Sequence, residues 1–394
     1  MGLQPANLHT YIEQELKDWA ELGVDGHVHA KNPWVGYHKM LTASTARIVG
    51  AMPSEVVAMN SLTVNLHLLM VSFYRPTRQR FKIIMEAGAF SSDMYAIESQ
   101  VRFHGLDPDK TIIELKPREK EFTIRHEDIL EAIEKNKKDL ALVMIGGVNY
   151  YTGQAFDMKG ITASAHKAGA LAGFDLAHAI GNIHLYLHDW KADFAVWCTY
   201  KYLNSGPGGV GGAFIHEKHI KRKDLPRFAG WWGHQEKERF LMKKGFIPIS
   251  TAEGWQVSNA PILSMAALKA SLDIFDEADI RRLIQKSQQL TAYMEYLIGT
   301  ECSSALNAEE KRKNQVALHK IKIITPKEID QRGCQLSIMI KKNSKELFEN
   351  LKKEGFIVDW RSPNVIRVAP VPLYNTFEDV YKFSKLLAET CCHE

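Results

Sequence analysis

Between residues 56 and 215, short apolar runs alternate with segments of helical periodicity, and this alternation constrains the fold more than any other feature of the sequence. Each apolar run has the length of a buried strand, and most are followed by an amphipathic stretch. Strands are predicted at 56–59, 82–86, 111–115, 140–145, 170–175, 194–197 and 212–215, with helices at 61–70, 95–101, 127–137 and 161–167. Strands that alternate with helices form a mostly parallel, doubly wound sheet, which binds ligands beyond the carboxyl ends of its strands. The fold class is therefore α/β, with the ligand site expected at one edge of the sheet.

The rest of the chain predicts a helix at the N-terminus and a smaller α+β domain at the C-terminus. Asn7 is placed to cap a helix that ends at Gly23, and an irregular loop is expected over 25–34. Two long helices should run to about Ile298, and the polar stretch 303–312 is typical of a surface joint. The small domain should contain strands at 321–324, 334–340, 356–358 and 365–369, and helices at 345–354 and 377–387. We therefore expect three regions, namely 1–30 (N-terminal helix and loop, packing with the small domain), 31–265 (large cofactor-binding domain) and 266–394 (connecting helices and small C-terminal domain).

Composition excludes several classes of protein. The chain has 394 residues, 45% hydrophobic and 24% charged, as in ordinary soluble globular proteins. A formal net charge of +4 is too small to indicate a nucleic-acid partner. The sequence contains neither an apolar run of about 18 residues nor a signal sequence, which argues against a membrane partner and against secretion. Five cysteines without a C-x-x-C pair suit reduced thiols, so a cytoplasmic protein is predicted. The loop histidines His27, His29 and His38 lack cysteine or carboxylate partners at ligand spacing, so no metal site is predicted.

A single lysine, Lys201, stands between Tyr200 and Tyr202 just beyond the strand predicted at 194–197. Aromatic neighbours exclude water from an amine, which favours its neutral, nucleophilic form. A glycine-rich turn follows, and glycines allow the backbone to pass close to a bound group. These glycines match the spacing G-x-G-x-x-G, but a strand rather than a helix follows them, so a dinucleotide site is rejected. Lys201 is therefore the candidate nucleophile.

Further residues at the same sheet edge complete a cofactor site. Asp175 ends the strand 170–175, and parallel strands bring it to the edge that holds Lys201. A carboxylate opposite a pyridine nitrogen keeps that nitrogen protonated, and a lysine amine condenses with an aldehyde on such a ring. The helix that begins at Ser61 offers a hydroxyl and free N–H groups to a phosphate, and Phe90 is placed to stack on a ring. This set predicts an enzyme that uses pyridoxal 5'-phosphate.

Several strings in the sequence resemble kynureninase, and the resemblance extends over nearly the whole chain. The strings are Asn60–His67, Tyr95–Gln100, Tyr151–Gln154, Gly173–Ala179, Tyr200–Asn204 and Ile366–Asn375. The resemblance implies the fold-type I aminotransferase architecture, with pyridoxal 5'-phosphate as cofactor and a homodimer with shared active sites. It also implies a hydrolase that converts L-kynurenine or 3-hydroxy-L-kynurenine to anthranilate or 3-hydroxyanthranilate and L-alanine. Such an enzyme acts in tryptophan catabolism, in the kynurenine pathway that leads to NAD biosynthesis.

The resemblance also implies roles for individual residues. Lys201 would hold the cofactor and move the substrate Cα proton, and Tyr200 would relay a proton to the carbanion left after Cβ–Cγ cleavage. The cofactor-binding residues would be Leu62, Thr63, Phe90, Ser91, Ser92, Asp93, Asp175, His178, Tyr200, Lys201, Trp231 and Asn259, the last two entering the partner subunit's site. The substrate-binding residues would be His27, Asn259 and Arg367, with Arg367 on the α-carboxylate. Because His27 and Asn259 are polar, a preference for the hydroxylated substrate is expected.

Two departures from the family pattern leave alternatives open. Gly146 stands where some members carry a serine near the phosphate, so one hydrogen bond to the phosphate is expected to be missing. The family pattern also has a strand ending in Gly-Asn-Ser-Leu before Gly2-Leu3-Gln4-Pro5; the sequence given starts at Met1, and slower turnover is expected than for a longer form. The alternatives are a truncated, inactive homologue that binds the cofactor, and another fold-type I reaction such as transamination or desulfuration. Desulfuration needs a mobile catalytic cysteine, whereas Cys198 lies in the strand before Lys201.

Overall fold

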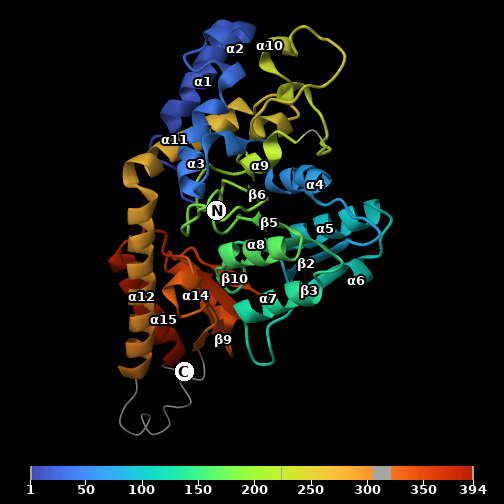
Figure 1. The fold of residues 1–394 in the computed structure, drawn as a ribbon. Helices are drawn as coiled ribbons and strands as arrows, with labels where there is room; N and C mark the ends of the chain where they lie inside the picture. The colour runs from blue at the N-terminus through green and yellow to red at the C-terminus, as the bar shows by residue number, and fades with distance from the viewer. Residues whose placement is uncertain (1, 223, 305–320, 393–394) are drawn as a thin grey trace. The chain divides into compact units, whose positions relative to one another are not determined.

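The computed structural model describes residues 2–222, 224–304 and 321–392, which divide into two units (Figure 1). The first unit comprises Met1–Lys116, Ile124–Gly147 and Phe156–Ile280, and the second comprises Pro117–Thr123, Val148–Ala155 and Arg281–Glu394. This division differs from the predicted boundaries at residues 30 and 265, because the first unit includes the N-terminal helix and continues to Ile280. The physical reason is that α1 (Leu8–Leu22) packs on α11 (Ile262–Ala278), where the Tyr11 hydroxyl donates a hydrogen bond to Asp273.

The described residues of the first unit form a seven-stranded sheet in the order β1-β7-β6-β5-β4-β2-β3. Its strands are β1 (Val56–Ala58), β2 (Lys82–Glu86), β3 (Ile112–Leu115), β4 (Leu140–Gly146), β5 (Leu171–Asp175), β6 (Phe194–Trp197) and β7 (Gly212–Ile215). Neighbouring strands are parallel except at β7, which is antiparallel to both β1 and β6. The predicted, mostly parallel sheet is thereby confirmed, and the carboxyl ends of β2, β4, β5 and β6 share one edge.

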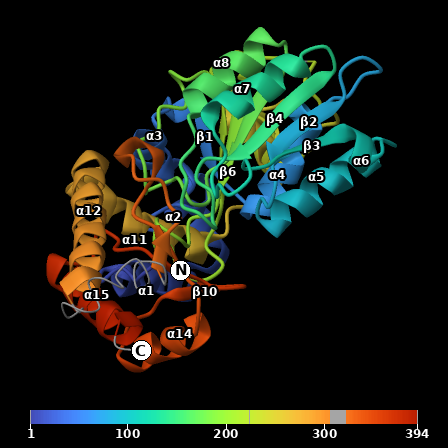
Figure 2. The ribbon, with the colours of Figure 1, turned by 90° about the horizontal axis from the view of Figure 1, so that it is seen from below.

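Helices cover both faces of this sheet. Helices α4 (Leu62–Phe73) and α5 (Ser91–Phe103) lie on one face, and α7 (His126–Lys135) and α8 (Met158–Lys167) lie on the other (Figure 2). Alternate strand residues belong to the core against α4 and α5, as the two-residue period of a strand requires; they include Ile83, Met85, Leu142, Met144, Phe194 and Val196. Burial of each such side chain stabilises the fold by about 1.5–3 kcal/mol. This core holds the strand ends, and the side chains on them, in fixed positions.

The N-terminal region agrees with the sequence only in part. The predicted helix is confirmed as α1, and Gly23 ends it at φ 55°, a left-handed value that glycine adopts without strain. Asn7 forms no cap with the described residues, because its backbone is already helical and its amide donates to the Ala270 carbonyl (3.0 Å). The loop predicted at 25–34 contains the short helix α2 (Gly26–His29).

Further helices of this unit are α3 (Lys39–Val49), α6 (Pro108–Thr111), α9 (Glu217–Ile220) and α10 (Glu236–Arg239), with 3-10 turns η1 (Gly23–Asp25), η2 (Trp34–Gly36), η3 (Pro53–Glu55), η4 (Trp231–Gly233) and η5 (Ala252–Trp255).

The described residues of the second unit contain a four-stranded antiparallel sheet in the order β10-β11-β9-β8. Its elements are α12 (Ile280–Ser304), β8 (Ile321–Ile323), η6 (Ile329–Gln331), β9 (Leu336–Ile340), α14 (Ser344–Lys353), β10 (Asp359–Arg361), β11 (Val365–Val368) and α15 (Phe377–Cys392). The strand predicted at 356–358 is wrong, because cross-strand pairing of Asp359 with Arg367 sets β10 further along the chain. The joint predicted at 303–312 lies outside the described residues from 305 onward. None of the helices in the described ranges is long and apolar enough to span a membrane.

Candidate active site

The carboxyl edge of the large sheet gathers titratable side chains that are far apart in the sequence. Glu86 ends β2, and Asp175 ends β5 opposite Gly146 of β4. Lys201 follows β6 in a turn closed by Thr199, whose hydroxyl donates to the Val210 carbonyl (2.5 Å). The parallel arrangement of the strands therefore creates the cluster that the sequence predicted around Lys201 and Asp175.

Lys201 lies among an imidazole and two aromatic rings. Its Nζ is 3.1 Å from Nε2 of His178. The same atom is 5.6 Å from the ring centroid of Phe90 and 6.0 Å from that of Tyr200. Phe90 is 41% exposed, so much of its ring is accessible to a ligand. The structure thus brings three of the predicted cofactor residues to the Lys201 amine.

Asp93 and Asp175 form a buried pair of carboxyl groups joined by a hydrogen bond. Burial, followed by the charge of Asp175, raises the pKa of Asp93 well above its ordinary value. Burial also raises the pKa of Asp175, whereas hydrogen bonds from Asp93 and from the Ala177 N–H (2.6 Å) and the charge of Lys201 act against that rise. The shared hydrogen bond raises the pKa of Asp93 and lowers that of Asp175, which favours a single shared proton on Asp93 with Asp175 as the carboxylate.

Glu86 is a third buried acid at this edge. Its two carboxyl oxygens accept a hydrogen bond from the Gly146 N–H, at 3.2 and 3.1 Å. Burial raises the pKa of Glu86 to about 7; the Gly146 N–H lowers it, and the charge of Asp175 raises it further. Glu86 is absent from the predicted site residues, although an acid at the last position of a buried strand marks the edge where such sheets bind ligands.

The amino end of α4 offers an anion site at the same edge. Ser61 occupies the N-cap position with an extended backbone, and its side chain makes no capping hydrogen bond with the described residues. Gly211 passes so close that a Cβ there would lie 3.0 Å from the Leu62 nitrogen. The helix start therefore leaves its first N–H groups, including that of Thr63, and the Ser61 hydroxyl available to an anion such as a phosphate. Ser91 and Ser92 likewise stand at the start of α5.

These residues fit pyridoxal 5'-phosphate. A protonated pyridine nitrogen is a cation of the kind that a buried carboxylate such as Asp175 requires. Oδ1 of Asp93 is buried and makes no hydrogen bond within the described ranges, so the acid pair has capacity for a further donor. The Lys201 amine can condense with the cofactor aldehyde. The Phe90 ring can stack on the cofactor ring, and the amino end of α4 can bind the phosphate.

Tyr200, the residue before Lys201, interacts with Cys198. Their side chains are hydrogen-bonded, and burial, followed by Cys198, raises the pKa of Tyr200 to about 12. Tyr200 is therefore a neutral phenol at neutral pH, with a proton to donate. Burial also raises the pKa of the Cys198 thiol, which is 2% exposed. A buried thiol of raised pKa is a poor nucleophile, so Cys198 is unsuited to desulfuration.

Four other predicted site residues have the following surroundings in the described structure. They are His27, Trp231, Asn259 and Arg367. The His27 ring lies edge-on to Trp34 at 5.2 Å, and the Trp231 indole donates to the Arg239 carbonyl at 3.0 Å. Asn259 is exposed, and Arg367 belongs to the second unit, where Asp359 binds it. The roles of these four residues stay predictions.

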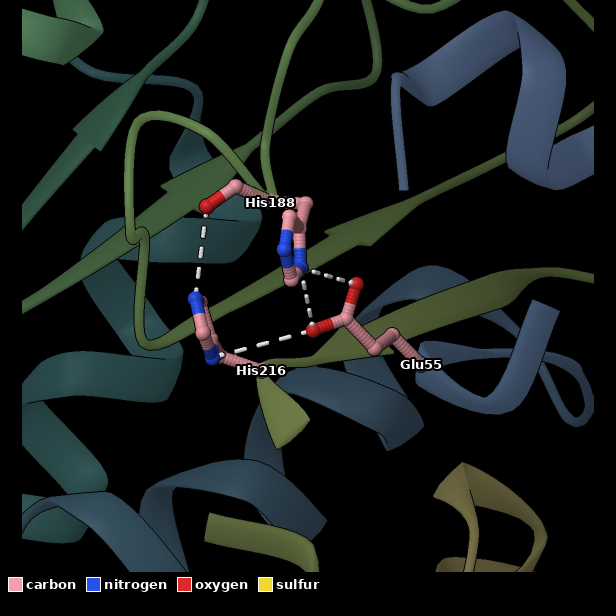
Figure 3. A group of neighbouring side chains, drawn as sticks. All are labelled: Glu55, His188 and His216. Carbon is pink, nitrogen blue, oxygen red and sulfur yellow. Dashed lines mark hydrogen bonds and ion pairs between the residues drawn. The ribbon is translucent and has the colours of Figure 1, made fainter. Parts of the chain in front are cut away.

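Glu55, His188 and His216 form a compact group away from the site, with potential ligand atoms within 4.8 Å of one another (Figure 3). The Glu55 carboxylate already accepts hydrogen bonds from His188 Nδ1 (3.0 Å) and from two backbone N–H groups, those of Met52 and Glu217. The two imidazole rings are stacked, with only 16° between their planes. Imidazole lone pairs lie in the ring plane, so two nearly parallel rings cannot both point at one ion. This group is therefore structural, and it joins η3 to the loop before β6, which holds His188, and to His216 at the end of β7.

The fold and the chemistry of this edge together define a class: the fold-type I enzymes that depend on pyridoxal 5'-phosphate. Solved structures of that fold superimpose on the chain. A cysteine desulfurase from Thermococcus onnurineus NA1 has a TM-score of 0.78 at 15% identity, covering 99% of this chain and 92% of that one. A C-DES variant with glycine covalently linked to its PLP cofactor has a TM-score of 0.79 at 14% identity, covering 98% and 94%. At such low identity the similarity shows the fold alone.

Sequence comparison identifies the family within that class. The chain is 54% identical over 387 residues to a kynureninase of Myxococcus xanthus, covering 98% of this chain and 87% of that protein. A kynureninase of Nematostella vectensis is 51% identical, covering 98% and 82%. The family described as the kynureninase C-terminal domain matches residues 283–387. The chain belongs to the kynureninase family, and its cofactor is pyridoxal 5'-phosphate.

Proposed function

We propose that this enzyme hydrolyses L-kynurenine, or its 3-hydroxy derivative, to an anthranilate and L-alanine. The single observation that carries the proposal is the convergence of Lys201, His178 and the Asp93–Asp175 pair at the carboxyl edge, in a chain 54% identical to a kynureninase. The same family membership supports a role in tryptophan catabolism, in the kynurenine pathway that leads to NAD biosynthesis. The free, buried thiol of Cys198 supports a cytoplasmic location.

Each residue at the edge has a separate task in this reaction. Bound pyridoxal 5'-phosphate supplies an electron sink for negative charge at the substrate Cα. Lys201 removes and returns the Cα proton, and His178, 3.1 Å away, orients its amine. Asp175 holds a proton on the pyridine nitrogen, and Asp93 keeps Asp175 charged by retaining the pair's own proton. Water adds to the γ-carbonyl and the aryl group leaves as the anthranilate, and Tyr200 donates a proton to the alanine Cβ that Cβ–Cγ cleavage leaves behind, since its phenol is neutral at neutral pH.

The remaining predicted residues complete the proposal. Leu62 and Thr63 bind the phosphate through the start of α4, as Ser91 and Ser92 do at α5, and Phe90 stacks on the cofactor ring. Arg367 binds the substrate carboxylate through its planar guanidinium. His27 and Asn259 border the aryl group and favour the 3-hydroxylated substrate, which a ratio of kcat/KM values for the two substrates tests.

We also propose a homodimer in which Trp231 and Asn259 enter the partner's site. Both residues are exposed in the single chain, Trp231 to 42%, as residues that complete another subunit's site should be. Sedimentation analysis tests the dimer, and activity restored by mixing a Lys201→Ala subunit with an Asn259→Ala subunit tests the shared site. No restored activity in stable mixed dimers would contradict it.

The function itself is tested by product analysis and by labelling. The holoenzyme incubated with L-kynurenine should release anthranilate and L-alanine in equal amounts. Borohydride reduction followed by peptide mapping should place the pyridoxyl group on Lys201 and on no other lysine. Sulfide release from cysteine, or amino-group transfer without cleavage, would identify a different fold-type I reaction. Absence of both products with cofactor correctly bound to Lys201 would identify an inactive homologue.

A further inference from the structure

Three charged side chains gather on the β10–β11 hairpin of the second unit. Asp359 on β10 lies directly opposite Arg367 on β11. Arg361 is two residues beyond Asp359 and therefore points to the same face of the strand. The Arg367 side chain is only 12% exposed, whereas Asp359 and Arg361 are 46% and 39% exposed. The hairpin register thus places one carboxylate between two guanidinium groups.

Asp359 binds the Nε side of the Arg367 guanidinium group. Its Oδ2 accepts from Nε of Arg367 at 2.6 Å and forms an ion pair with Nη2. Nη1 of Arg367 donates to the carbonyl of Tyr150. An arginine has five N–H groups, and these contacts with described residues use one on each nitrogen. One N–H is left on each terminal nitrogen, which is what bidentate binding of a carboxylate requires.

Arg361 balances the charge of Asp359. Its Nε donates to the same Oδ2 at 2.8 Å. Two guanidinium cations and one carboxylate leave one positive charge in excess, so the cluster attracts an anion even though Arg367 is already paired. The ring of Tyr150 has its centroid 5.9 Å from each guanidinium and restricts both.

We propose that Asp359 is the positioning residue of the substrate-carboxylate site, and that Arg361 is its charge partner. Asp359 fixes the Nε edge of Arg367 and so presents the two terminal N–H groups to the α-carboxylate of an amino-acid substrate. Arg361 prevents Asp359 from cancelling the positive charge that the carboxylate needs. The inference rests on the proposed function, in which Arg367 binds that carboxylate.

Steady-state kinetics of the holoenzyme with L-kynurenine tests this role. Asp359→Ala should raise KM about tenfold and leave kcat within about twofold, because only binding of the carboxylate is weakened. Asp359→Asn keeps an oxygen that accepts from Nε, and its KM should stay within about threefold of wild type. Arg361→Gln should raise KM by a smaller factor that disappears at high salt, because Arg361 is partly exposed. Glu378→Ala, which breaks an exposed pair with Lys382 in the same unit, is the matched control and should change neither constant.

Binding of L-alanine, followed by the cofactor absorption band, gives a readout that does not need turnover. Its dissociation constant should rise in Asp359→Ala and recover in Asp359→Asn. An unchanged or lower KM and dissociation constant in Asp359→Ala would overturn the proposal, as would equal losses in the two Asp359 variants. Failure of the wild-type enzyme to release anthranilate would refute the proposed function instead, and the alanine titration would still decide the role of Asp359.

Discussion

Exchanging the two buried aspartates for asparagine should have unequal effects, because the pair holds only one proton. In Asp175→Asn the carboxylate proposed to face the pyridine nitrogen is lost. A hydrogen bond to a charged group contributes about 1.5–3 kcal/mol, so cofactor affinity should fall about 10- to 150-fold. In Asp93→Asn the amide N–H replaces the acid O–H as donor to Asp175, and no charge should be removed, since burial raises the pKa of Asp93 and favours its neutral form. Its cofactor affinity should stay within about threefold of wild type.

Titration of each cofactor-free variant with pyridoxal 5'-phosphate, followed by absorbance at pH 7.5, measures these affinities. Asp93→Ala is the control, because it removes the donor as well as the acid and should fall between the two asparagine variants. Turnover should follow the same order, with Asp175→Asn the slowest. Equal losses in Asp93→Asn and Asp175→Asn would refute the assignment of the proton to Asp93. Undiminished affinity in Asp175→Asn would refute the pairing of Asp175 with the pyridine nitrogen.

Two further predictions concern pH. Burial raises the pKa of Glu86 from 4.5 to about 7. The stability that this pKa shift contributes is therefore fully present below about pH 4.5 and is lost as the pH rises to about 7. The free energy of unfolding of the cofactor-free protein, measured in urea, should therefore decline over this range relative to Glu86→Gln, and a constant difference would contradict the shift. The hydrogen bond to Glu55 raises the pKa of His188, so its contribution is complete below about pH 6.5 and is lost as the pH rises through the folded value. The difference in unfolding temperature between wild type and His188→Gln should be largest in mild acid and shrink at alkaline pH; growth of the difference with pH would show the opposite sign.

Most strands in the large unit could be predicted because they are short apolar runs buried along nearly their whole length, with the half-buried β3 as the exception. β2 was predicted at its observed bounds, and β6 and β7 likewise. Prediction failed where long-range contacts decide the local structure. Asn7 has a cap residue's chemistry, but the hydrogen bond from its amide to the Ala270 carbonyl fixes the side chain, and its Oδ1 accepts no hydrogen bond from the described residues. β10 carries charged residues on a strand that local hydrophobicity does not mark, and its bounds follow from pairing with β11.

The same distinction explains what could be predicted of the site. The proximity of Lys201, Asp175 and Phe90 was predictable because parallel strands bring their carboxyl ends to one edge, whatever the details of register, while their roles stay predictions. The proton shared by Asp93 and Asp175 was not predictable, because it depends on side-chain distances and burial that no local pattern encodes. Glu86 was missed for the same reason: its proximity to Asp175 arises from the pairing of β2 with β4 and of β4 with β5.

Buried acids occur at both edges of the large sheet, and the contrast between them indicates why the carboxyl edge needs a cationic ligand. At the opposite edge, Asp193 accepts hydrogen bonds from His166 (2.8 Å) and His219 (2.7 Å). Burial alone would raise the pKa of Asp193, but these donors and Lys218 hold it well below its ordinary value. At the carboxyl edge, three acids are buried with Lys201 as their nearby cation, and burial raises the pKa of each. Protonation of Asp93 and, below about pH 7, of Glu86 relieves the repulsion at that edge, and the hydrogen bond from Asp93 favours a charge on Asp175 that a pyridinium nitrogen can neutralise. Binding of the cofactor must therefore stabilise the folded chain, and this stabilisation should weaken in Asp175→Asn but not in Asp93→Asn.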